Sequence, residues 1–199
     1  MSISQHELES MLLNSDKGKF AEALVNRHFD DILRLGYLIL GDMQDAQDAE
    51  QETFVDALVH IERYEPGSNL RAWLAKIALH KSQAILRKRK ARNRLEIVLK
   101  SIHLQIGRTP TTLDSVLQNE IKTSLWTAIN KLDVKHKVPI ILYYVNDYSI
   151  DEIAEILSLK KGTVNSRLHY ALKKLRNNIL FLETHPYKKS PQKSKEINQ

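Results

Sequence analysis

The chain has 199 residues, a formal net charge of +6 and a sequence pI of about 9.4. It contains no cysteine, which excludes a disulfide framework and a thiolate metal site and favours a reducing compartment. The basic balance favours a polyanionic partner, nucleic acid or acidic lipid, without choosing between them.

Glycine and proline are scarce, at 6 and 5 residues, so the turn-rich signature of β-sheets is missing. Strong helix formers abound, and we expect an all-α protein. The first residues lack the basic start and long apolar core of a secretory signal. No apolar run approaches the ~20 residues of a membrane-spanning helix. We therefore expect a cytoplasmic location.

The N-terminal part predicts a short amphipathic turn within residues 1–18 and then one long helix from Lys19 to Leu40. Apolar side chains recur along this second segment at helical spacing. Gly36 is expected to loosen its end, and Gly41 is expected to stop it.

The segment from Asp45 to Ile61 predicts a helix with one apolar stripe and one acidic face. Every charged residue between Asp42 and Asp56 is acidic. Like charges this dense repel one another, so the acidic face either binds a basic surface on a partner or is simply solvated. The residues that share it are Asp45, Asp48, Gln51 and Glu52.

A turn-rich loop at Tyr64–Asn69 leads into a predicted helix from Leu70 to Arg94, capped by Ser68 or Asn69. Its cations are Arg71, Lys76, Lys81, Arg87, Lys88, Arg89, Lys90, Arg92 and Arg94, and it has no acidic residue from Arg71 onwards. A membrane surface could attract such a cluster. Nucleic acid is favoured because the end of this helix has almost no apolar face to sink into lipid.

Residues 95–118 have weak periodicity and contain Gly107 and Pro110, which predicts a linker with a loose helix at its start. Helices resume near Asn119 to Lys131, and Asp133 can cap the next one. Pro139 predicts a kink or a late start in that helix because proline lacks an N–H donor.

Residues 149–175, SIDEIAEILSLKKGTVNSRLHYALKKL, predict a helix-turn-helix. Ser149 and Glu152 form a capping-box signature, and Ser158 to Lys160 interrupt the apolar pattern. Polar donors and cations on the second helix suit DNA bases and phosphates, although an ordinary helical hairpin would share the pattern. The outward residues are Lys161, Thr163, Asn165, Ser166, Arg167, His169, Tyr170, Lys173 and Lys174.

Three motifs in this order resemble the extracytoplasmic-function sigma factors, two-domain members of the sigma-70 family. DAQDAEQETFVDAL, at Asp45 to Leu58, is similar to the polymerase-binding helix, whose usual form is DAEDLVQEVF. LRAWLAKIALHKSQAILRKRKAR, at Leu70 to Arg92, is similar to the minus-ten reader. YSIDEIAEILSLKKGTVNSRLHYALKKLR is similar to the minus-thirty-five reader, with GTVxSRL intact.

The resemblance implies two helical domains that bind core RNA polymerase and promoter DNA. Their expected bounds are 1–94 for the first, 95–118 for a flexible linker, 119–183 for the second and 184–199 for a disordered basic tail. No small-molecule substrate, cofactor, metal or catalytic residue is expected. Anti-sigma factors commonly regulate this family, so one is a candidate partner.

The resemblance also implies roles for individual residues. Asp45, Asp48, Gln51 and Glu52 would bind the polymerase. The minus-ten element would be melted and held by Tyr64, Asn69, Trp73, Lys76, His80, Lys81, Arg87, Lys88, Arg89 and Lys90. The minus-thirty-five element would be read by Lys161, Thr163, Asn165, Ser166, Arg167, His169, Tyr170 and Lys173.

Four positions depart from the common family pattern. His80 and Ala84 stand where many relatives have Asn and Asp, which puts base choice at the minus-ten element in doubt. Asn165 replaces a common Lys or Arg and so removes one contact to phosphate or guanine. Ser158 replaces a usual Gly in the turn, at a cost on the order of 1 kcal/mol in left-handed geometry.

Two other classes of function compete with this interpretation. A helix-turn-helix regulator that reads a palindrome as a dimer would explain the second module. It would give no role to the acidic helix or to the basic helix. A metal-dependent phosphoesterase would use Asp45, Asp48 and Glu52 with His60 or His80. No Glu-x-x-His pair supports that site.

Overall fold

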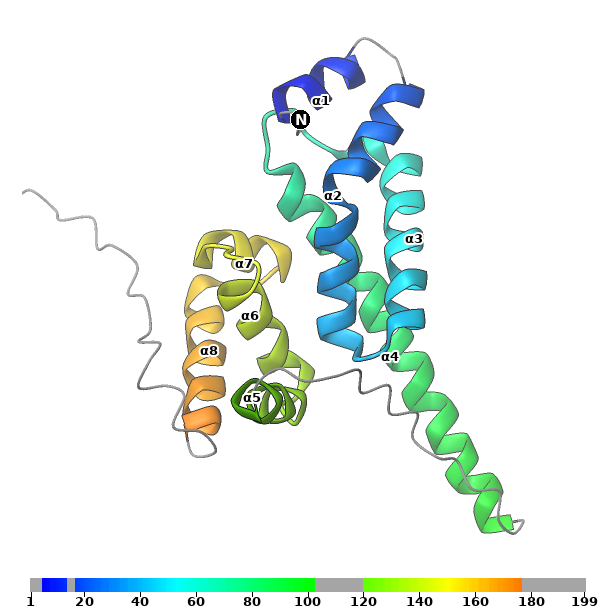
Figure 1. Ribbon diagram of the computed structural model, residues 1–199, viewed down its shortest axis with the longest axis vertical. Coiled ribbons are helices and arrows are strands. Elements are labelled where there is room, and N and C mark those ends of the chain that lie inside the picture. The colour runs from blue at the N-terminus through cyan, green and yellow to red at the C-terminus, as the bar shows by residue number, and fades with distance from the viewer. Residues whose placement is uncertain (1–4, 14–16, 103–119, 177–199) are drawn as a thin grey trace, which may run out of the picture.

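The computed structural model describes residues 5–13, 17–102 and 120–176, and throughout these ranges the chain forms helices joined by turns (Figure 1). The all-α prediction is confirmed. The predicted linker falls largely within residues 103–119 and the predicted tail within 177–199, both outside the described residues. Among the described residues, no helix has the length and apolar character needed to cross a bilayer.

The first module is a bundle in which α2, α3 and α4 lie side by side, with α1 across one end (Figure 1). Its elements are α1 Gln5–Leu13, α2 Lys17–Leu40, α3 Met43–Val59, the short 3₁₀ helix η1 Ile61–Arg63 and α4 Leu70–Ile102. Gly36 does not loosen α2, which continues to Leu40. It is buried and lets the helices approach closely, since a Cβ there would lie 3.4 Å from the carbonyl oxygen of Ala46 in α3.

The apolar stripe predicted for α3 faces the core. Ala46, Ala49, Phe54 and Ala57 are at most 5% exposed. The helix begins slightly earlier than expected because the Asp42 side chain accepts a hydrogen bond from the backbone N–H of Asp45 at 2.9 Å. This fixes which face of α3 points outward.

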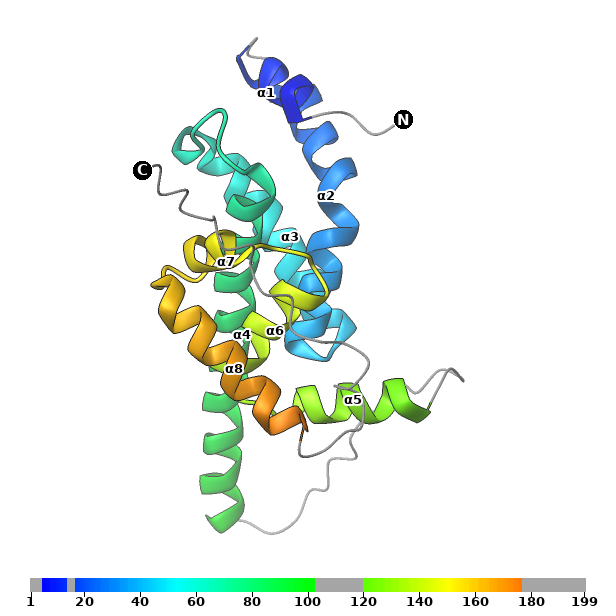
Figure 2. The same ribbon diagram turned by 90° about the vertical axis from the view of Figure 1, so that its left-hand side faces the viewer.

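Helix α4 is longer than predicted. It was expected to end at Arg94 but continues to Ile102 and projects beyond the bundle (Figure 2). The added sequence LEIVLKSI contains no glycine or proline, and the first glycine after it is Gly107. The helix expected at the start of the linker is therefore present, but it is continuous with α4 because helix propensity extends the helix past Arg94.

The second module contains α5 Glu120–Asn130, α6 Val134–Tyr144, α7 Ile150–Ile156 and α8 Lys161–Arg176. Of the kink or late start expected for α6, the late start is wrong. The helix begins at Val134, where the carbonyl of Asp133 accepts from the N–H groups of His136 and Lys137, and it continues through Pro139. Pro139 is itself buried, as are the apolar residues on either side of it, so packing offsets its missing hydrogen bond.

The predicted capping box and turn are both present between α7 and α8. The hydroxyl of Ser149 accepts from the N–H of Glu152, whose carboxylate accepts from the N–H of Ser149 at 2.7 Å. After α7, the N–H of Leu159 donates to Ala154 at 2.8 Å and that of Ser158 to Glu155 at 3.1 Å, which forms a Schellman motif. Ser158 has a φ of 52° and therefore adopts left-handed geometry.

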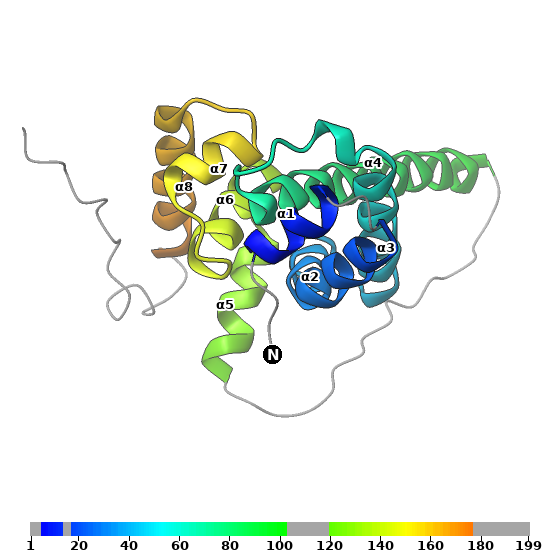
Figure 3. The same ribbon diagram turned by 90° about the horizontal axis from the view of Figure 1, so that it is seen from above.

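The two modules pack against each other. Seen from above, α5 to α8 lie on one side of the first module, with α6 against α2 and α7 against the start of α4 (Figure 3). Helix α3 lies on the opposite side of the first module (Figures 1 and 3). The second module therefore leaves the outward face of α3 uncovered.

Candidate protein-docking and nucleic-acid interfaces

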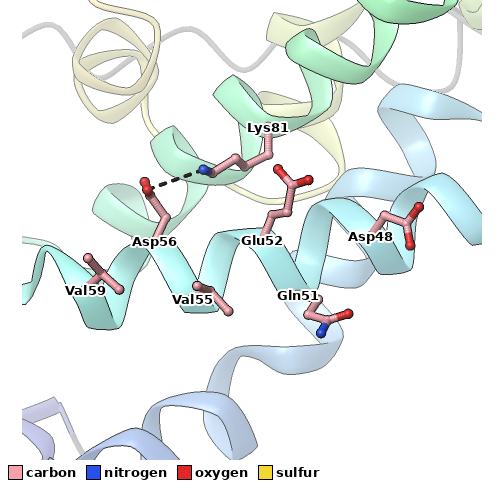
Figure 4. A pocket seen from close by; sticks show the side chains of 7 residues that line it. All are labelled: Asp48, Gln51, Glu52, Val55, Asp56, Val59 and Lys81. Atoms are coloured by element: carbon pink, nitrogen blue, oxygen red, sulfur yellow. Dashed lines mark ion pairs between the residues drawn. The ribbon is translucent and has the colours of Figure 1, made fainter.

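The outward face of α3 combines carboxylates with exposed valines along the helix (Figure 4). It lines a surface depression together with Lys81 of α4, through Asp48, Gln51, Glu52, Val55, Asp56 and Val59. Val55 and Val59 are 56% and 64% exposed, which is unusual for residues near the middle and end of a packed helix. Exposed apolar side chains rimmed by charge are typical of a protein-docking surface.

Three of the predicted polymerase-binding residues lie together on this face, and the fourth does not. Asp48, Gln51 and Glu52 are exposed, whereas the carboxylate of Asp45 is only 25% exposed and pairs with Arg89 of α4. The same guanidinium donates to the carbonyl of Leu40 at 3.0 Å, so it also caps the end of α2. Arg89 and Asp45 hold the bundle together at this end.

Lys81 lies at the edge of the acidic face rather than on the basic surface. Its ammonium is 3.3 Å from Asp56, as the dashed line in Figure 4 shows, and the imidazole of His60 lies 3.4 Å from the same carboxylate. In this structure Lys81 therefore neutralises part of the α3 face and does not contribute to the basic surface of α4.

The loop before α4 is held in place by packing. Tyr64 is 4% exposed, and its hydroxyl donates to the Glu9 carboxylate of α1 at 2.6 Å and to the Ser68 carbonyl at 3.0 Å. Its ring lies 5.5 Å from that of Trp73. Tyr64 is a core residue here rather than a DNA-facing one, which sequence could not reveal because its partner Glu9 lies on another helix.

Asn69 caps α4, as predicted. Its side-chain oxygen accepts from the N–H of Ala72 at 3.0 Å. Its amide nitrogen donates to Glu152 at the start of α7, in the second module. The residue expected to face the minus-ten element is therefore bound by the other half of the same chain.

The remaining cations of α4 separate into an outer and an inner set. Half-buried Lys76 and exposed His80 and Arg87 recur at helical spacing on one outer face, and Lys88 and Lys90 are exposed beside it. Trp73 shares this spacing but is half-buried and packs against the core. Arg89 falls on the inward phase, in register with buried Ala78 and Ser82, which explains its contact with α2 and α3. The outer set forms a basic surface suited to a phosphate backbone.

Helix α8 presents the predicted polar face. Val164, Leu168, Ala171 and Leu175 are at most 3% exposed and face the core. Arg167 is half-buried, and the other predicted DNA-binding residues, Lys161, Thr163, Asn165, Ser166, His169, Tyr170 and Lys173, are exposed. Partners within the module already engage some of them: Lys161 pairs with Asp151 at 2.8 Å, and the Ser166 hydroxyl donates to the Gly162 carbonyl at 2.9 Å.

Helix α6 contributes residues to this surface that no sequence motif indicates. The ring of His136 stacks on that of Tyr170, with centroids 4.3 Å apart, while the ammonium of Lys174 lies 5.6 Å from the Tyr170 centroid. Burial, with the charge of nearby Lys135, lowers the pKa of His136. No local pattern links α6 to α8, so only the fold brings this imidazole to the edge of the DNA-facing surface.

The described residues contain no cluster of His, Asp or Glu side chains that would support the metal-site alternative. Within the described ranges, no three His, Asp or Glu side chains gather closely enough to hold a metal ion. Asp45 pairs with Arg89, and His60 lies beside Asp56, so two of the residues named for that site are engaged elsewhere.

Comparison with known proteins decides the family. A family model described as Sigma-70 region 2 matches residues 24–92, and one described as Sigma-70, region 4 matches residues 122–175. The chain is 31% identical over 172 residues to the ECF RNA polymerase sigma factor SigW of Bacillus subtilis, a match that covers 82% of this chain and 90% of SigW. The chain belongs to the extracytoplasmic-function sigma factors of the sigma-70 family.

Other relatives agree with this assignment. The ECF RNA polymerase sigma factor SigE of Mycolicibacterium smegmatis is 28% identical over 156 residues, covering 78% of this chain and 60% of SigE. The fold resembles that of the Bartonella quintana sigma factor RpoE, solved in complex with the anti-sigma factor NepR. That match has a TM-score of 0.61 and 23% identity and covers 77% of this chain and 92% of RpoE.

Family membership fixes the general activity. Sigma factors bind core RNA polymerase and direct it to promoters, so this chain is a promoter-directing initiation factor that binds DNA. A stand-alone helix-turn-helix regulator is not better supported by any of these matches.

Proposed function

We propose that this sigma factor docks on core RNA polymerase through the outward face of α3, with Asp48, Gln51 and Glu52 as the polar contacts and Val55 and Val59 as the apolar ones. A basic surface on the polymerase would complement the carboxylates. The exposed valines would add apolar surface that becomes buried in the interface, which the charged side chains cannot provide. In this proposal Asp45 does not contact the polymerase; its ion pair with Arg89 stabilises the helical bundle.

One observation supports the proposal: the acidic surface, the basic surface and the polar DNA-facing surface lie on three different helices, α3, α4 and α8. Helix α3, which carries the acidic residues and the exposed valines, lies on the side of the first module away from the second module (Figure 3). The outer cations of α4 and the polar face of α8 belong to different modules. One protein partner and two segments of DNA would account for these surfaces together.

The promoter-reading surfaces follow from the side chains of α4 and α8 that are exposed or half-buried. On α4, Trp73, Lys76, His80, Arg87, Lys88 and Lys90 would hold the non-template strand at the minus-ten element, with Asn69 contacting a flipped base once it is released from Glu152. On α8, Arg167 and Asn165 would read bases at the minus-thirty-five element, and Lys161, Thr163, Ser166, His169, Tyr170 and Lys173 would contact bases or phosphates.

The chain performs no chemistry itself in this proposal, because phosphodiester synthesis belongs to the polymerase, and it acts in the cytoplasm. The solved relative RpoE is bound by an anti-sigma factor. We infer that this chain is also controlled by such a protein, which a pull-down from the native host would identify.

Run-off transcription tests the proposal. Purified core polymerase and this chain are combined on a library of upstream DNA sequences, and the transcripts are sequenced. The proposal expects initiation downstream of one shared pair of elements only when both proteins are present. A footprint by the chain alone on a palindrome, with no transcripts, would instead support a stand-alone regulator.

A further inference from the structure

Tyr170 lies on the DNA-facing side of α8. It follows Ser166 by four residues and Arg167 by three, so the three side chains share one face of the helix. Among the described residues of the second module, Tyr170 is the one large apolar side chain that is exposed, at 46%. An aromatic ring is therefore available to a partner of α8, next to the arginine proposed to read bases.

Two helices hold this ring in one orientation. The His136 ring of α6 stacks on it, with centroids 4.3 Å apart and planes inclined by 28°. Lys174, which follows Tyr170 by one turn on α8, brings its ammonium to 5.6 Å from the same centroid. A tyrosine on a helix surface has more than one allowed side-chain rotamer. The contact across from α6 favours a single one of them.

The His136 imidazole packs as a neutral ring. Its Nδ1 is inaccessible to solvent and has no hydrogen-bond partner among the described residues, so a charged imidazolium would bury an unpaired N–H there. Burial is the main cause of its lowered pKa; the charges of Lys135, Arg167 and Lys174 lower the pKa further, and Asp133 raises it. At neutral pH, His136 therefore offers Tyr170 an aromatic surface rather than a positive charge.

We propose that His136 is a positioning residue for promoter recognition, which by stacking on Tyr170 fixes the tyrosine ring in the orientation that α8 presents to the minus-thirty-five element. Fixing the ring beforehand favours binding because less side-chain freedom is lost in the complex. His136 lies outside the helix-turn-helix segment, residues 149–175, so part of the reading surface is built from α6. The inference rests on the proposed function of α8.

The test measures discrimination, which is the ratio of the affinities of the polymerase complex for the selected minus-thirty-five element and for a scrambled one. His136→Ala should lower this ratio about 2- to 10-fold, the range that corresponds to the stabilisation of an aromatic pair. His136→Phe keeps an aromatic ring and should retain the wild-type ratio. Wild-type discrimination in His136→Ala, or no rescue by His136→Phe, would overturn the proposal.

A double-mutant cycle shows whether His136 acts through Tyr170. Tyr170→Ala should lower discrimination by itself. Adding His136→Ala to Tyr170→Ala should then have no further effect, because the ring that His136 positions is gone. Additive losses would show that His136 contacts DNA independently, and wild-type discrimination in Tyr170→Ala would show that the ring reads nothing. Either result would overturn the positioning role.

Val138→Ala is the matched control for a general loss of packing. Val138 is 2% exposed and lies two positions after His136, so it projects from another side of α6. The substitution should lower the free energy of unfolding but leave discrimination unchanged. A loss of discrimination equal to that of His136→Ala would make His136 a packing residue only.

His136→Gln keeps the test decisive if circular dichroism shows His136→Ala to be unfolded. Glutamine fills part of the same space but has no aromatic ring, so the folded variant should lose discrimination to the same extent. Wild-type discrimination in His136→Gln would overturn the proposal.

Arg167→Ala separates this inference from the proposed function of α8. A loss of discrimination in Arg167→Ala, with none in His136→Ala, would overturn the role of His136 and leave the proposed function standing. Wild-type discrimination in both Arg167→Ala and Tyr170→Ala would instead overturn the proposal that α8 reads the minus-thirty-five element.

Discussion

Arg89 of α4 pairs with Asp45 at the start of α3, so a cation expected to bind DNA and a carboxylate expected to bind polymerase satisfy each other. Arg89 also donates to the carbonyl of Leu40. This one side chain therefore joins α4 to the end of α2 and to the start of α3. Its neighbour Arg87, on the same helix, is exposed.

Substitution of Arg89 should therefore affect stability, whereas substitution of Arg87 should affect DNA binding. Arg89→Ala should lower the free energy of unfolding by about 1–2 kcal/mol, because it removes a partly buried ion pair and a helix cap. Arg87→Ala should leave stability within about 0.5 kcal/mol and weaken binding of single-stranded DNA. Urea denaturation and fluorescence anisotropy measure the two effects. Equal loss of stability in both variants would contradict this assignment.

Ser158 offers a substitution that should stabilise the second module. Its φ of 52° lies in the left-handed region, where a Cβ is unfavourable and glycine is not. Ser158→Gly should raise the free energy of unfolding by about 0.5–1 kcal/mol, after allowing for the greater entropy of glycine in the unfolded chain. Ser158→Ala keeps the Cβ and should give no such gain. Thermal melts of both variants would show the difference.

The parts of this structure that sequence predicted are those that depend on neighbours along the chain. The capping box of Ser149 and Glu152, the turn at Ser158 and the outward face of α8 all follow from spacing within a few residues. The burial of Tyr64, the pairing of Arg89 and the stacking of His136 depend on other helices. Local periodicity carries no information about those partners, so Tyr64 and Arg89 were predicted to contact DNA and no role was predicted for His136.

Buried His28 should make stability fall in mild acid. It is 5% exposed, and its Nε2 has no hydrogen-bond partner among the described residues. Burial, with Arg27 nearby, lowers its pKa from 6.5 to about 4. A histidine with a lowered folded pKa contributes stability that is present above pH 6.5 and is lost as the pH falls toward 4.

The size of this effect follows from linkage. His28 should account for a loss of about 2 kcal/mol in the free energy of unfolding between about pH 7 and pH 5. His28→Leu should lack this component, so the difference between the two proteins in urea denaturation isolates it. Parallel pH profiles would show that His28 does not resist protonation in the folded chain.

Arg167 should carry more sequence discrimination than Lys173. Arg167 is half-buried near the middle of the α8 face, whereas Lys173 is exposed in its last turn. Arg167→Ala should reduce discrimination at the minus-thirty-five element by about 1–3 kcal/mol. Lys173→Ala should weaken binding to native and scrambled elements alike. These affinities are measured with the polymerase complex, and equal loss on both DNAs for Arg167→Ala would make it a phosphate contact only.

The most direct test of the whole account is reversal of charge on the outward face of α3. Asp48→Lys combined with Glu52→Lys should abolish co-elution with core RNA polymerase, while circular dichroism stays that of the wild type. Asp151→Lys combined with Glu155→Lys, a matched reversal on exposed positions of α7, should still co-elute. Unchanged co-elution of the α3 variant would contradict polymerase docking through this face.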